Sequence, residues 1–556
     1  MNGLVMLIVS AVVLLLAYVF YGRWLARKWG IDPQKKTPAH EFQDGVDYVP
    51  TSPSVVFGHE FASIAGAGPI NGPIIAAMFG WLPVLLWILI GGIFFGAVQD
   101  FSAIYASVKN KGKTIGYIIE TYIGKTGKRL FLLFVWLFSI LVVAAFADIV
   151  AGTFGGFDAE GAKVAANASV ATTSCLFIMA AVGLGFFIRK RKPKGLQSGI
   201  VAVALLVICI ALGLRFPFFM QKNLWLYFVF IYIFIASITP VWALLQPRDY
   251  LNSFLLIAMI AGAFIGIVFS APAISIPAFT GFEVNGNYLF PVLFVTVACG
   301  AVSGFHSLVA SGTASKQIDN EKHMLPISFG AMLVESLLAV IALITVGALA
   351  VGGKLPAGTP PMIFAGAISG FLRNLGLPEN ATYTLITLSV SAFALTSLDS
   401  VARVGRLAFQ ELFSDDRSEG AQGLSRVLAN KYVATLLTLF VGYLLAILGY
   451  QNIWPLFGSA NQLLAALALI ACAVFLKKTN RQGVMLYLPM FIMLAVTFTA
   501  LIFTIQAKGG KLFDGTFSVA ADGLQLIFAI LLLALGIMVA VSGVSKLSEK
   551  KAAAGR

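Results

Sequence analysis

The chain has 556 residues, of which 59% are hydrophobic and only 11% are charged. Apolar runs of about 20 residues recur along it, so composition excludes a water-soluble globular protein and indicates an all-α polytopic membrane protein. The net charge of +14 would also suit a nucleic-acid partner, so the positions of the basic residues must decide between the two.

Hydropathy, with Gly and Pro read as interruptions, predicts fifteen transmembrane helices joined by connections too short for a soluble domain. The first span follows an N-terminus without basic residues and precedes Arg23, Arg27 and Lys28, which is typical of a retained anchor. The predicted spans are residues 4–22, 54–78, 82–106, 129–152, 172–188, 197–214, 224–246, 251–271, 290–312, 327–352, 383–405, 431–450, 455–476, 485–507 and 520–545.

The basic residues lie mainly on one side of the predicted membrane. With the N-terminus outside, the 38 Lys and Arg residues divide 31 to 7 in favour of the cytoplasm, as the positive-inside rule requires. The charge therefore reports topology rather than a nucleic-acid partner, and it also suits contact with anionic membrane lipid. The cytoplasmic groups include Lys109, Lys111, Lys113, Lys125, Lys128 and Arg129, then 189–192 with Lys194, and the tail residues Lys546, Lys550, Lys551 and Arg556.

Two connections contain amphipathic stretches, residues 114–123 inside and 360–372 outside. Each is predicted to form a short helix at the membrane interface, and the second alternatively dips into the membrane and returns. Ordinary packed connectors are the competing interpretation. The four cysteines lie in apolar segments, so disulfides are not expected: Cys175, Cys209, Cys299 and Cys472.

Two predicted spans, in segments 57–69 and 298–313, carry glycines and a histidine where a membrane helix should be continuous. Backbone groups in lipid must be satisfied internally, so a helix can break there only where it is buried in protein or lines a cavity. The sequence therefore predicts a substrate site at the two breaks. Its candidate residues are Gly58, His59, Glu60, Ser63, Gly66 and Gly68, with Gly300, Gly304, His306, Ser307 and Ser311.

The two broken spans run in opposite directions, because the second comes seven spans after the first. After the anchor, the other fourteen spans divide into two sets of seven, each led by a Gly/His segment. This pattern predicts an inverted repeat. The expected units are 1–53 (anchor and cytoplasmic loop), 54–271 (first repeat), 290–545 (second repeat) and 546–556 (basic cytoplasmic tail).

Five acidic residues lie deep enough in the predicted spans to count as intramembrane: Glu60, Asp100, Asp148, Glu335 and Asp399. A charge at mid-bilayer costs roughly 2.5 to 3.5 kcal/mol on insertion scales, so such residues are usually functional or paired. Asp148 is close to the outer end of its span, where solvation explains it. The other four are at similar depth in the inner halves of their spans, which favours one central site.

Simpler interpretations compete for several of these residues. Asp399 can pair with Arg403 one turn later on the same helix. Thr396 and Ser397 can bond back to their own helix. His59 alone would be a packing residue, but Glu60 beside it and His306 in the mirror position favour a role in the site.

The chain contains several long motifs: 47–69, 96–101, 304–307, 396–399 and 453–458, followed by Asn461 and Gln462. Over about residues 47 to 470 these motifs resemble the carbon starvation protein A (CstA) family. The resemblance implies a bacterial-type inner-membrane transporter, for peptides in some members and pyruvate in others, distantly related to the LeuT-like superfamily. It also implies a LeuT-like 5+5 core with extra helices, with a 7+7 inverted repeat as the alternative.

The resemblance also implies site roles. In the LeuT-like superfamily a hydroxyl pair like Thr396 and Ser397 supplies oxygen ligands to a coupling sodium ion. The chain departs from the CstA pattern at Glu60, where many members have a second histidine, and longer members carry extra C-terminal spans.

A broken helix presents free N–H groups, which attract carboxylates, and free carbonyls, which attract cations. A carboxylate is therefore expected on the amides near 66–68 or 300–304, with His59 and His306 exchanging a symported proton. The acids are candidates for proton or ion coupling or for holding a peptide's amino terminus: Glu60, Asp100, Glu335 and Asp399.

The sequence therefore predicts a secondary active transporter for short peptides or a small monocarboxylate, coupled to a proton or sodium gradient by alternating access. The alternative is a cation channel or divalent-metal transporter with His59, Glu60, His306 and Asp100 as ligands. An intramembrane enzyme lacks a nucleophile elbow, a zinc pair and a cofactor loop, so neither an enzyme nor a cofactor is expected.

Overall fold

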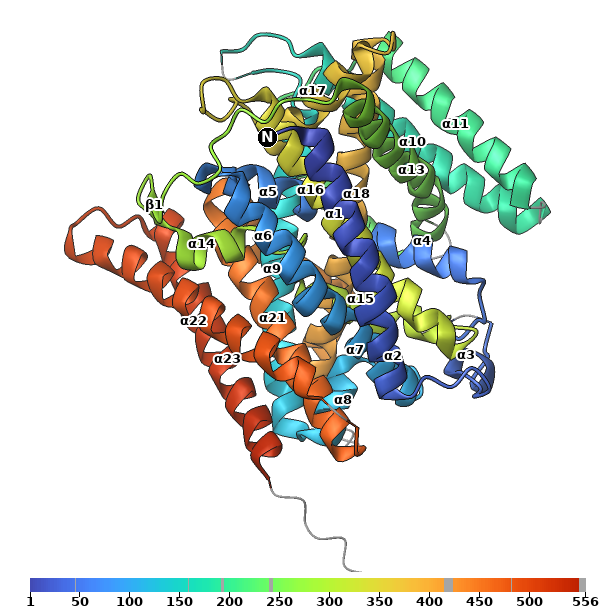
Figure 1. Ribbon diagram of the computed structural model, residues 1–556, viewed down its shortest axis with the longest axis vertical. Coiled ribbons are helices and arrows are strands. Elements are labelled where there is room, and N and C mark those ends of the chain that lie inside the picture. The colour runs from blue at the N-terminus through green and yellow to red at the C-terminus, as the bar shows by residue number, and fades with distance from the viewer. Residues whose placement is uncertain are drawn as a thin grey trace, which may run out of the picture.

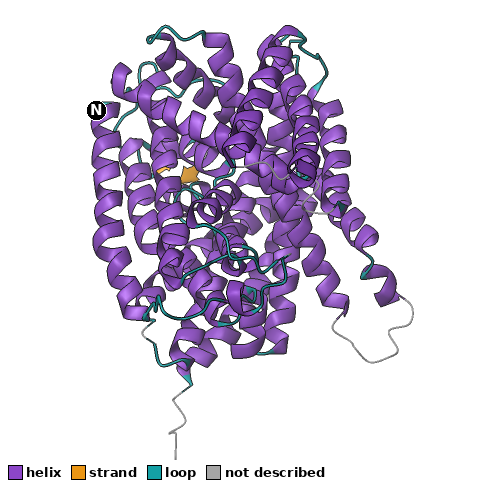
Figure 2. Ribbon diagram, turned by 90° about the vertical axis from the view of Figure 1, so that its right-hand side faces the viewer, coloured by secondary structure: helices purple, strands orange, loops and turns teal. Residues whose placement is uncertain are grey.

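The protein is a bundle of long α-helices with one short strand hairpin among the residues described (Figure 1). A side view shows helices throughout the thickness of the bundle (Figure 2). This computed structural model describes residues 1–45, 47–158, 160–191, 195–239, 244–414, 424–481 and 483–549. The predicted basic residues at 192, 194, 550, 551 and 556 lie outside the described residues.

The N-terminal anchor is a continuous apolar helix on the outside of the bundle. Its start is capped by Asn2, whose Oδ1 accepts the Leu4 N–H at 2.8 Å, and its end by Gly30 in the left-handed region (φ 67°). Trp29 fixes the inner end by stacking on Phe101, with ring centroids 5.0 Å apart. The segments are α1 (Gly3–Leu16), the π-helical turn η1 (Ala17–Gly22), α2 (Arg23–Trp29) and the short α3 (Pro38–Glu41).

The first predicted broken span is confirmed: α4 and α5 are separate helices bent by 45°. A long span with a π-helical turn follows, then the short helix predicted at 114–123, then a long central helix. The bounds are α4 (Pro53–Ile64), α5 (Gly68–Ala76), η2 (Ala77–Phe79), α6 (Trp81–Gly91), η3 (Gly92–Gly96), α7 (Ala97–Lys109), α8 (Ile115–Tyr122) and α9 (Lys125–Phe154).

Four further helices follow α9, and α10 and α11 form a hairpin at the edge of the bundle (Figure 1). α10 and α13 also pack against α18, which lies deeper in the bundle. A strand hairpin with Glu283 opposite Tyr288 leads into the second half. The bounds are α10 (Ala165–Arg191), α11 (Gly195–Arg215), α12 (Lys222–Ile238), α13 (Leu245–Ser270), β1 (Glu283–Val284) and β2 (Asn287–Tyr288).

The second predicted break is also present, and residues 297–303 separate α14 from α15. The elements that follow repeat the earlier order of a span with a π-helical turn, a short helix and a long helix. The short helix is the one predicted at 360–372. The bounds are α14 (Leu289–Thr296), α15 (Gly304–Gly312), η4 (Ala314–Lys316), η5 (Glu321–His323), η6 (Pro326–Gly330), α16 (Ala331–Leu349), α17 (Pro360–Arg373) and α18 (Glu379–Ser414).

The last helices enclose and complete the core. α21 is buried from Leu456 to Leu476 and packs against α9, α22 and α23. α9 and α18 form the most extensive helix pair, so α9, α18 and α21 make up the centre of the bundle. The bounds are α19 (Leu424–Leu428), α20 (Lys431–Ala446), α21 (Tyr450–Lys478), α22 (Val484–Phe513), η7 (Val519–Gly523) and α23 (Leu524–Ser548).

The described residues contain 11 helices long and apolar enough to cross a membrane, or up to 12 with the bent pair α4–α5. In the described residues each predicted span overlaps at least one helix, but α12 and α20 are shorter than this criterion requires, and residues 297–303 separate α14 from α15. The predicted count of fifteen is therefore not confirmed.

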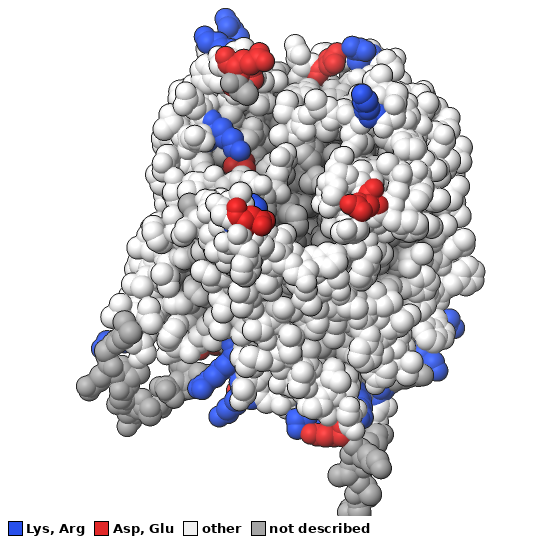
Figure 3. Space-filling view, turned by 90° about the vertical axis from the view of Figure 1, so that its left-hand side faces the viewer, with Lys and Arg blue, Asp and Glu red and all other residues white. Residues whose placement is uncertain are grey.

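Surface chemistry agrees with a membrane location. On the face drawn in Figure 3, charged side chains lie in the upper part and at the lower end, with an uncharged band between them. The N-terminus lies at the top of Figure 1 and the last turn of α23 at the bottom. Opposite ends are what an odd number of membrane crossings requires.

Candidate functional site

The first helix break follows from its local sequence. α4 ends at Ile64 because Ala65 leaves the helical conformation (φ −76°, ψ 56°). α5 restarts at Gly68, with Pro69 in its first turn, where the missing proline N–H leaves no helix hydrogen bond unmade. The break therefore opens backbone groups in the centre of the bundle.

Two glycines of this break allow close contact with other parts of the site. A Cβ atom on Gly68 would lie 2.6 Å from Cβ of Cys299, so glycine is needed where the two broken helices touch. A Cβ atom on Gly66 would lie 2.5 Å from Oγ of Ser397 in α18. The first break therefore meets both the second break and the hydroxyl predicted to hold a cation.

Side chains satisfy much of the backbone freed at the second break. Three donate to its carbonyls, and Oδ1 of Asn461 in α21 accepts the Phe305 N–H at 3.1 Å. Fewer carbonyls are therefore free to bind a cation there than the sequence suggested. The donors are Trp454 Nε1 to Thr296 O (3.3 Å), Trp87 Nε1 to Val297 O (3.1 Å) and Gln99 Nε2 to Ser303 O (2.9 Å).

Four of the predicted titratable residues converge in a buried cluster. The His306 ring of α15 lies between two carboxylates, with Nδ1 2.9 Å from Asp100 Oδ2 of α7 and Nε2 3.2 Å from Glu335 Oε2 of α16. The three side chains are at most 1% exposed. Glu60 of α4 is buried close enough to interact with the charges of Asp100 and His306, and neither of its carboxylate oxygens has a hydrogen-bond partner.

This cluster is strongly unbalanced in charge. It contains three carboxyl groups and one imidazole, and no described Lys or Arg forms an ion pair with Glu60, Asp100 or Glu335. Unpaired charge is expensive inside protein in a membrane. The cluster is therefore suited to bind protons or another cation.

His59 is next to Glu60 in α4 but belongs to different surroundings. Its strongest charged neighbour is Asp249 of α13, and its side chain is partly exposed. The mirror relation between His59 and His306 predicted from the sequence therefore does not bring them into one cluster. Consecutive helical residues point about 100° apart, which separates the two side chains.

Asp399 forms a second cluster, and its predicted pairing with Arg403 is wrong. Arg248 of α13 pairs with Asp399 and donates to Tyr232 Oη at 2.6 Å, while Tyr232 Oη donates to Asp399 Oδ2 at 2.8 Å. Arg403 instead donates to the carbonyls of Ala236 and Thr239, at the end of α12. Packing of α12 and α13 on α18 outweighs the pairing along the helix.

The prediction that Asp148 is solvated is also wrong. It is buried at the outer end of α9 rather than solvated, with its Oδ1 2.8 Å from Lys222 Nζ and its Oδ2 accepting the Tyr450 N–H at 2.9 Å. Tyr450 is the first residue of α21, so Asp148, which belongs to α9, caps the N-terminus of that helix. This role is structural.

The two predicted hydroxyl ligands of α18, Thr396 and Ser397, contact different neighbours. Thr396 Oγ1 accepts a hydrogen bond from Asn252 Nδ2 of α13 at 2.6 Å and donates to Ala392 O at 3.0 Å. Ser397 instead faces Gly66 and a small cavity. The two hydroxyls therefore do not point toward one common cation position.

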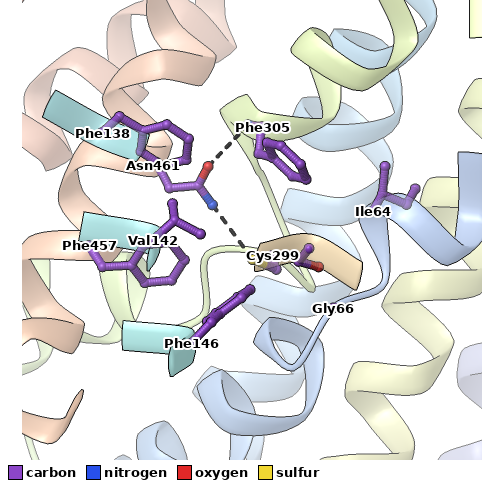
Figure 4. Close-up of a pocket in the computed structure, with 10 residues that line it drawn as sticks. Ile64, Gly66, Phe138, Val142, Phe146, Cys299, Phe305, Phe457 and Asn461 are labelled. Atoms are coloured by element: carbon purple, nitrogen blue, oxygen red, sulfur yellow. Dashed lines mark hydrogen bonds between the residues drawn. The ribbon is translucent and has the colours of Figure 1, made fainter. Parts of the chain in front are cut away.

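That cavity lies between both helix breaks, α9, α18 and α21 (Figure 4). Its wall is mainly apolar and includes four phenylalanines, among them Phe146 and Phe457, while Ser397 and Asn461 supply polar groups. Asn461 Nδ2 also contacts Cys299 Sγ at 3.6 Å, which links α21 to the second break. The cavity has room for about one water molecule.

Several other predicted site residues make contacts within their own helix or with a neighbouring one. Gly300 and Gly304 allow close approach of Ala339 and of the α21 backbone. Three serines bond to carbonyls of their own helices, and Gly58 has open space around it. The serine bonds are Ser63 to His59 O (2.8 Å), Ser307 to Gly304 O (2.7 Å) and Ser311 to Ser307 O (2.6 Å).

Sequence reasoning missed Asn252, Arg248 and Asn461 as site residues. Arg248 lies between the predicted spans 224–246 and 251–271, so it resembled a loop residue. Asn461 in an apolar run was the available signal, since a buried amide needs partners. Among the described residues, no group of three His, Cys, Asp or Glu side chains could hold a metal ion, so the metal candidates His59, Glu60 and His306 gain no support.

Fold and site together define a multi-pass helical membrane protein with a charged centre beside two broken helices. The family model described as carbon starvation protein CstA matches residues 2–357 and 353–500. The chain belongs to this family, which confirms the resemblance seen in its motifs.

The curated relatives are named as transporters and not as enzymes. The chain is 32% identical over 557 residues to the peptide transporter CstA of Escherichia coli (strain K12), covering 86% of this chain and 78% of that protein. It is 33% identical over 535 residues to the peptide transporter CstA of Bacillus subtilis (strain 168), covering 86% of each. It is 32% identical over 604 residues to the pyruvate/proton symporter BtsT of E. coli, covering 92% and 82%.

Solved structures of other transporters are similar only in outline. A manganese transporter of Eremococcus coleocola has a TM-score of 0.48 and 14% identity, covering 90% of this chain and 98% of that one. MhsT in complex with L-phenylalanine has a TM-score of 0.44 and 13% identity, covering 89% and 99%. At these values the similarity supports no argument about substrate or mechanism.

Proposed function

We propose that this chain is a secondary active transporter of the cytoplasmic membrane that couples a proton gradient to uptake of a short peptide or a small monocarboxylate such as pyruvate. The names of its relatives, peptide transporters and a pyruvate/proton symporter, support this class of substrate. The observation that carries the proposal is the buried cluster of His306, Asp100, Glu335 and Glu60.

The charge of this cluster supports a proton as the coupling ion. Three ionised carboxylates around one imidazole would repel each other strongly at low dielectric, so the cluster is expected to hold exchangeable protons. Its members come from α4, α7, α15 and α16. Movement of the broken helices α4 and α15 relative to the other two would change these contacts and so release or bind a proton.

The order of elements supports alternating access by two inverted halves. Each half has a broken span, a span with a π-helical turn, a short helix and a long helix. α5 packs on α16 while α15 packs on α7, so each second half-helix contacts the other half's following span. α8 lies at the bottom of Figure 1 and α17 at the top, as inversion requires.

We infer that the substrate carboxylate binds at the first break. The Gly68 N–H, at the N-terminus of α5, is next to the cavity lined by Ser397 and Asn461, whereas Pro69 has no N–H and those of Ile70 and Asn71 donate to Ala67 O. The cavity is too small for a peptide or pyruvate as it stands, so we infer that binding accompanies opening of the site.

The direct test is uptake by purified protein in proteoliposomes. Labelled pyruvate and a labelled dipeptide are compared with and without an imposed inward proton gradient. We expect one label to accumulate only with the gradient, and a protonophore to abolish the accumulation. If neither label exceeds protein-free liposomes, the proposed function is wrong.

Glu335→Gln provides a matched variant for the coupling step, because it keeps the shape of the side chain but removes its charge. We expect it to exchange labelled for unlabelled substrate across the membrane yet fail to accumulate label with the gradient. Gradient-driven accumulation equal to wild type would remove the cluster from the coupling mechanism.

A further inference from the structure

Two successive polar contacts join α13 to one face of α18. Asn252 donates to Thr396 at 2.6 Å, and Arg248, one turn earlier in α13, pairs with Asp399, about one turn later in α18. The two helices therefore run antiparallel past each other, with matched donors on α13 and acceptors on α18. All four side chains are at most 1% exposed.

This face of α18 is where the family resemblance implied a sodium ion. A hard cation binds through oxygen lone pairs. The Asn252 amide nitrogen lies 2.6 Å from Thr396 Oγ1 and 3.5 Å from Ala392 O, so it occupies the space between the two oxygens. Its hydrogens carry partial positive charge and therefore attract the same oxygen lone pairs that would bind a cation. Ser397, the other predicted ligand, faces Gly66 instead.

The carboxylate of this face, Asp399, already has a cationic partner that belongs to the chain, Arg248, whose Nη2 also lies 3.2 Å from Asp249 Oδ1. Asp399 receives the Arg248 guanidinium and the Tyr232 hydroxyl. Arg248 is permanently charged and cannot leave the site as a transported ion does. Positive groups that belong to the chain, the Arg248 guanidinium and the Asn252 amide, therefore contact Asp399 Oδ2 and Thr396 Oγ1, while Asp399 Oδ1 and Asn252 Oδ1 have no hydrogen-bond partner.

We propose that Asn252 and Arg248 of α13 take the place of a coupling sodium ion at α18, and that Asn252 is the residue that makes the site sodium-independent. This inference rests on the proposed transport function, since it concerns the cation that drives it. Asn252 acts by occupying the cation's position rather than by contacting the substrate.

The test uses purified full-length protein and compares sodium chloride with choline chloride at equal ionic strength and pH. We expect the wild-type unfolding temperature, and its exchange of labelled against unlabelled pyruvate, to be the same in both salts. A sodium-dependent rise in either quantity for the wild type overturns the proposal.

Two variants test the role of Asn252 itself. Asn252→Asp keeps the size of the side chain and replaces the donor by an oxygen, and Asn252→Ala removes it. We expect sodium to raise the unfolding temperature of Asn252→Asp, and the double variant Asn252→Asp/Thr396→Ala to lose that rise. If neither single variant responds to sodium, Asn252 is not the determinant.

The unfolding measurement separates this inference from the proposed function. It needs no substrate and no gradient, so it remains decisive if pyruvate and dipeptide both fail to be transported. Conversely, a wild-type sodium response together with proton-driven accumulation would overturn the inference alone.

Discussion

Two neighbouring residues, His59 and Glu60, show that the role of a residue in this site depends on the direction in which its side chain points. Glu60 is buried within the electrostatic reach of Asp100 and His306, whereas the charged group that acts on His59 is Asp249 of α13. Their shared place in the sequence suggested a common role. The side chains separate because adjacent positions on a helix point about 100° apart.

Replacing His306 should therefore have a different effect from replacing His59. His306→Ala removes the only basic group between Asp100 and Glu335, and we expect gradient-driven uptake to fall to the level of protein-free liposomes. His59→Ala is expected to keep at least about half of the uptake. Both variants are checked for membrane expression. Equal loss of uptake in both variants would mean that His59 also takes part in coupling.

The Arg248–Asp399 pair should dominate stability at its position. Arg248→Met leaves a buried carboxylate without its cation, and removing one partner of a buried pair costs about 3 to 5 kcal/mol. We expect a clear drop in the unfolding temperature in detergent, and partial recovery in Arg248→Met/Asp399→Leu.

Arg403→Ala is the matched control for this pair, because it removes only the hydrogen bonds to the end of α12. A loss of about 1 to 3 kcal/mol is expected from two charged-donor hydrogen bonds. If Arg403→Ala is as damaging as Arg248→Met, Asp399 depends on Arg403 after all.

At the scale of elements, the sequence predicted where helices occur better than how they end. Glycine and Pro69 located the first break, and two short connecting helices, α8 and α17, formed at the amphipathic stretches 114–123 and 360–372. α12 and α20 are shorter than the predicted spans because hydropathy shows where an apolar run lies but not where its helix ends.

Contact between the two breaks gives an element-scale prediction. Gly68→Ala places a Cβ atom 2.6 Å from Cys299 Cβ, so we expect it to separate the breaks and abolish transport. Cys299→Gly should restore transport in the double variant by making room. Gly58→Ala is the control, since nothing lies within 4 Å of its added Cβ. Failure of the double variant to recover would mean that the clash is not the cause.

At the scale of the whole molecule, the charge distribution predicts which end of the bundle faces the cytoplasm. In a cysteine-free background, Lys354→Cys in the connection before α17 should react with a membrane-impermeant maleimide added to intact cells. Lys35→Cys, in the segment between α2 and α3, should react only after permeabilisation. Labelling in the reverse order would invert the topology.

The sequence by itself determined the membrane class, the family, the two helix breaks and most of the buried acids. These follow from local composition, since lipid demands apolar runs and penalises every polar group and every interrupted helix. The same argument cannot pair residues that are far apart in the chain.

Only the tertiary structure decided which side chains pair with one another. Packing brought His306 to Asp100 and Glu335, gave Asp399 to Arg248 rather than Arg403, and placed Asn252 on Thr396. Each pairing joins helices whose spacing depends on how the whole bundle packs. Side-chain direction and helix packing are therefore the physical reason that a list of candidate residues became two distinct clusters.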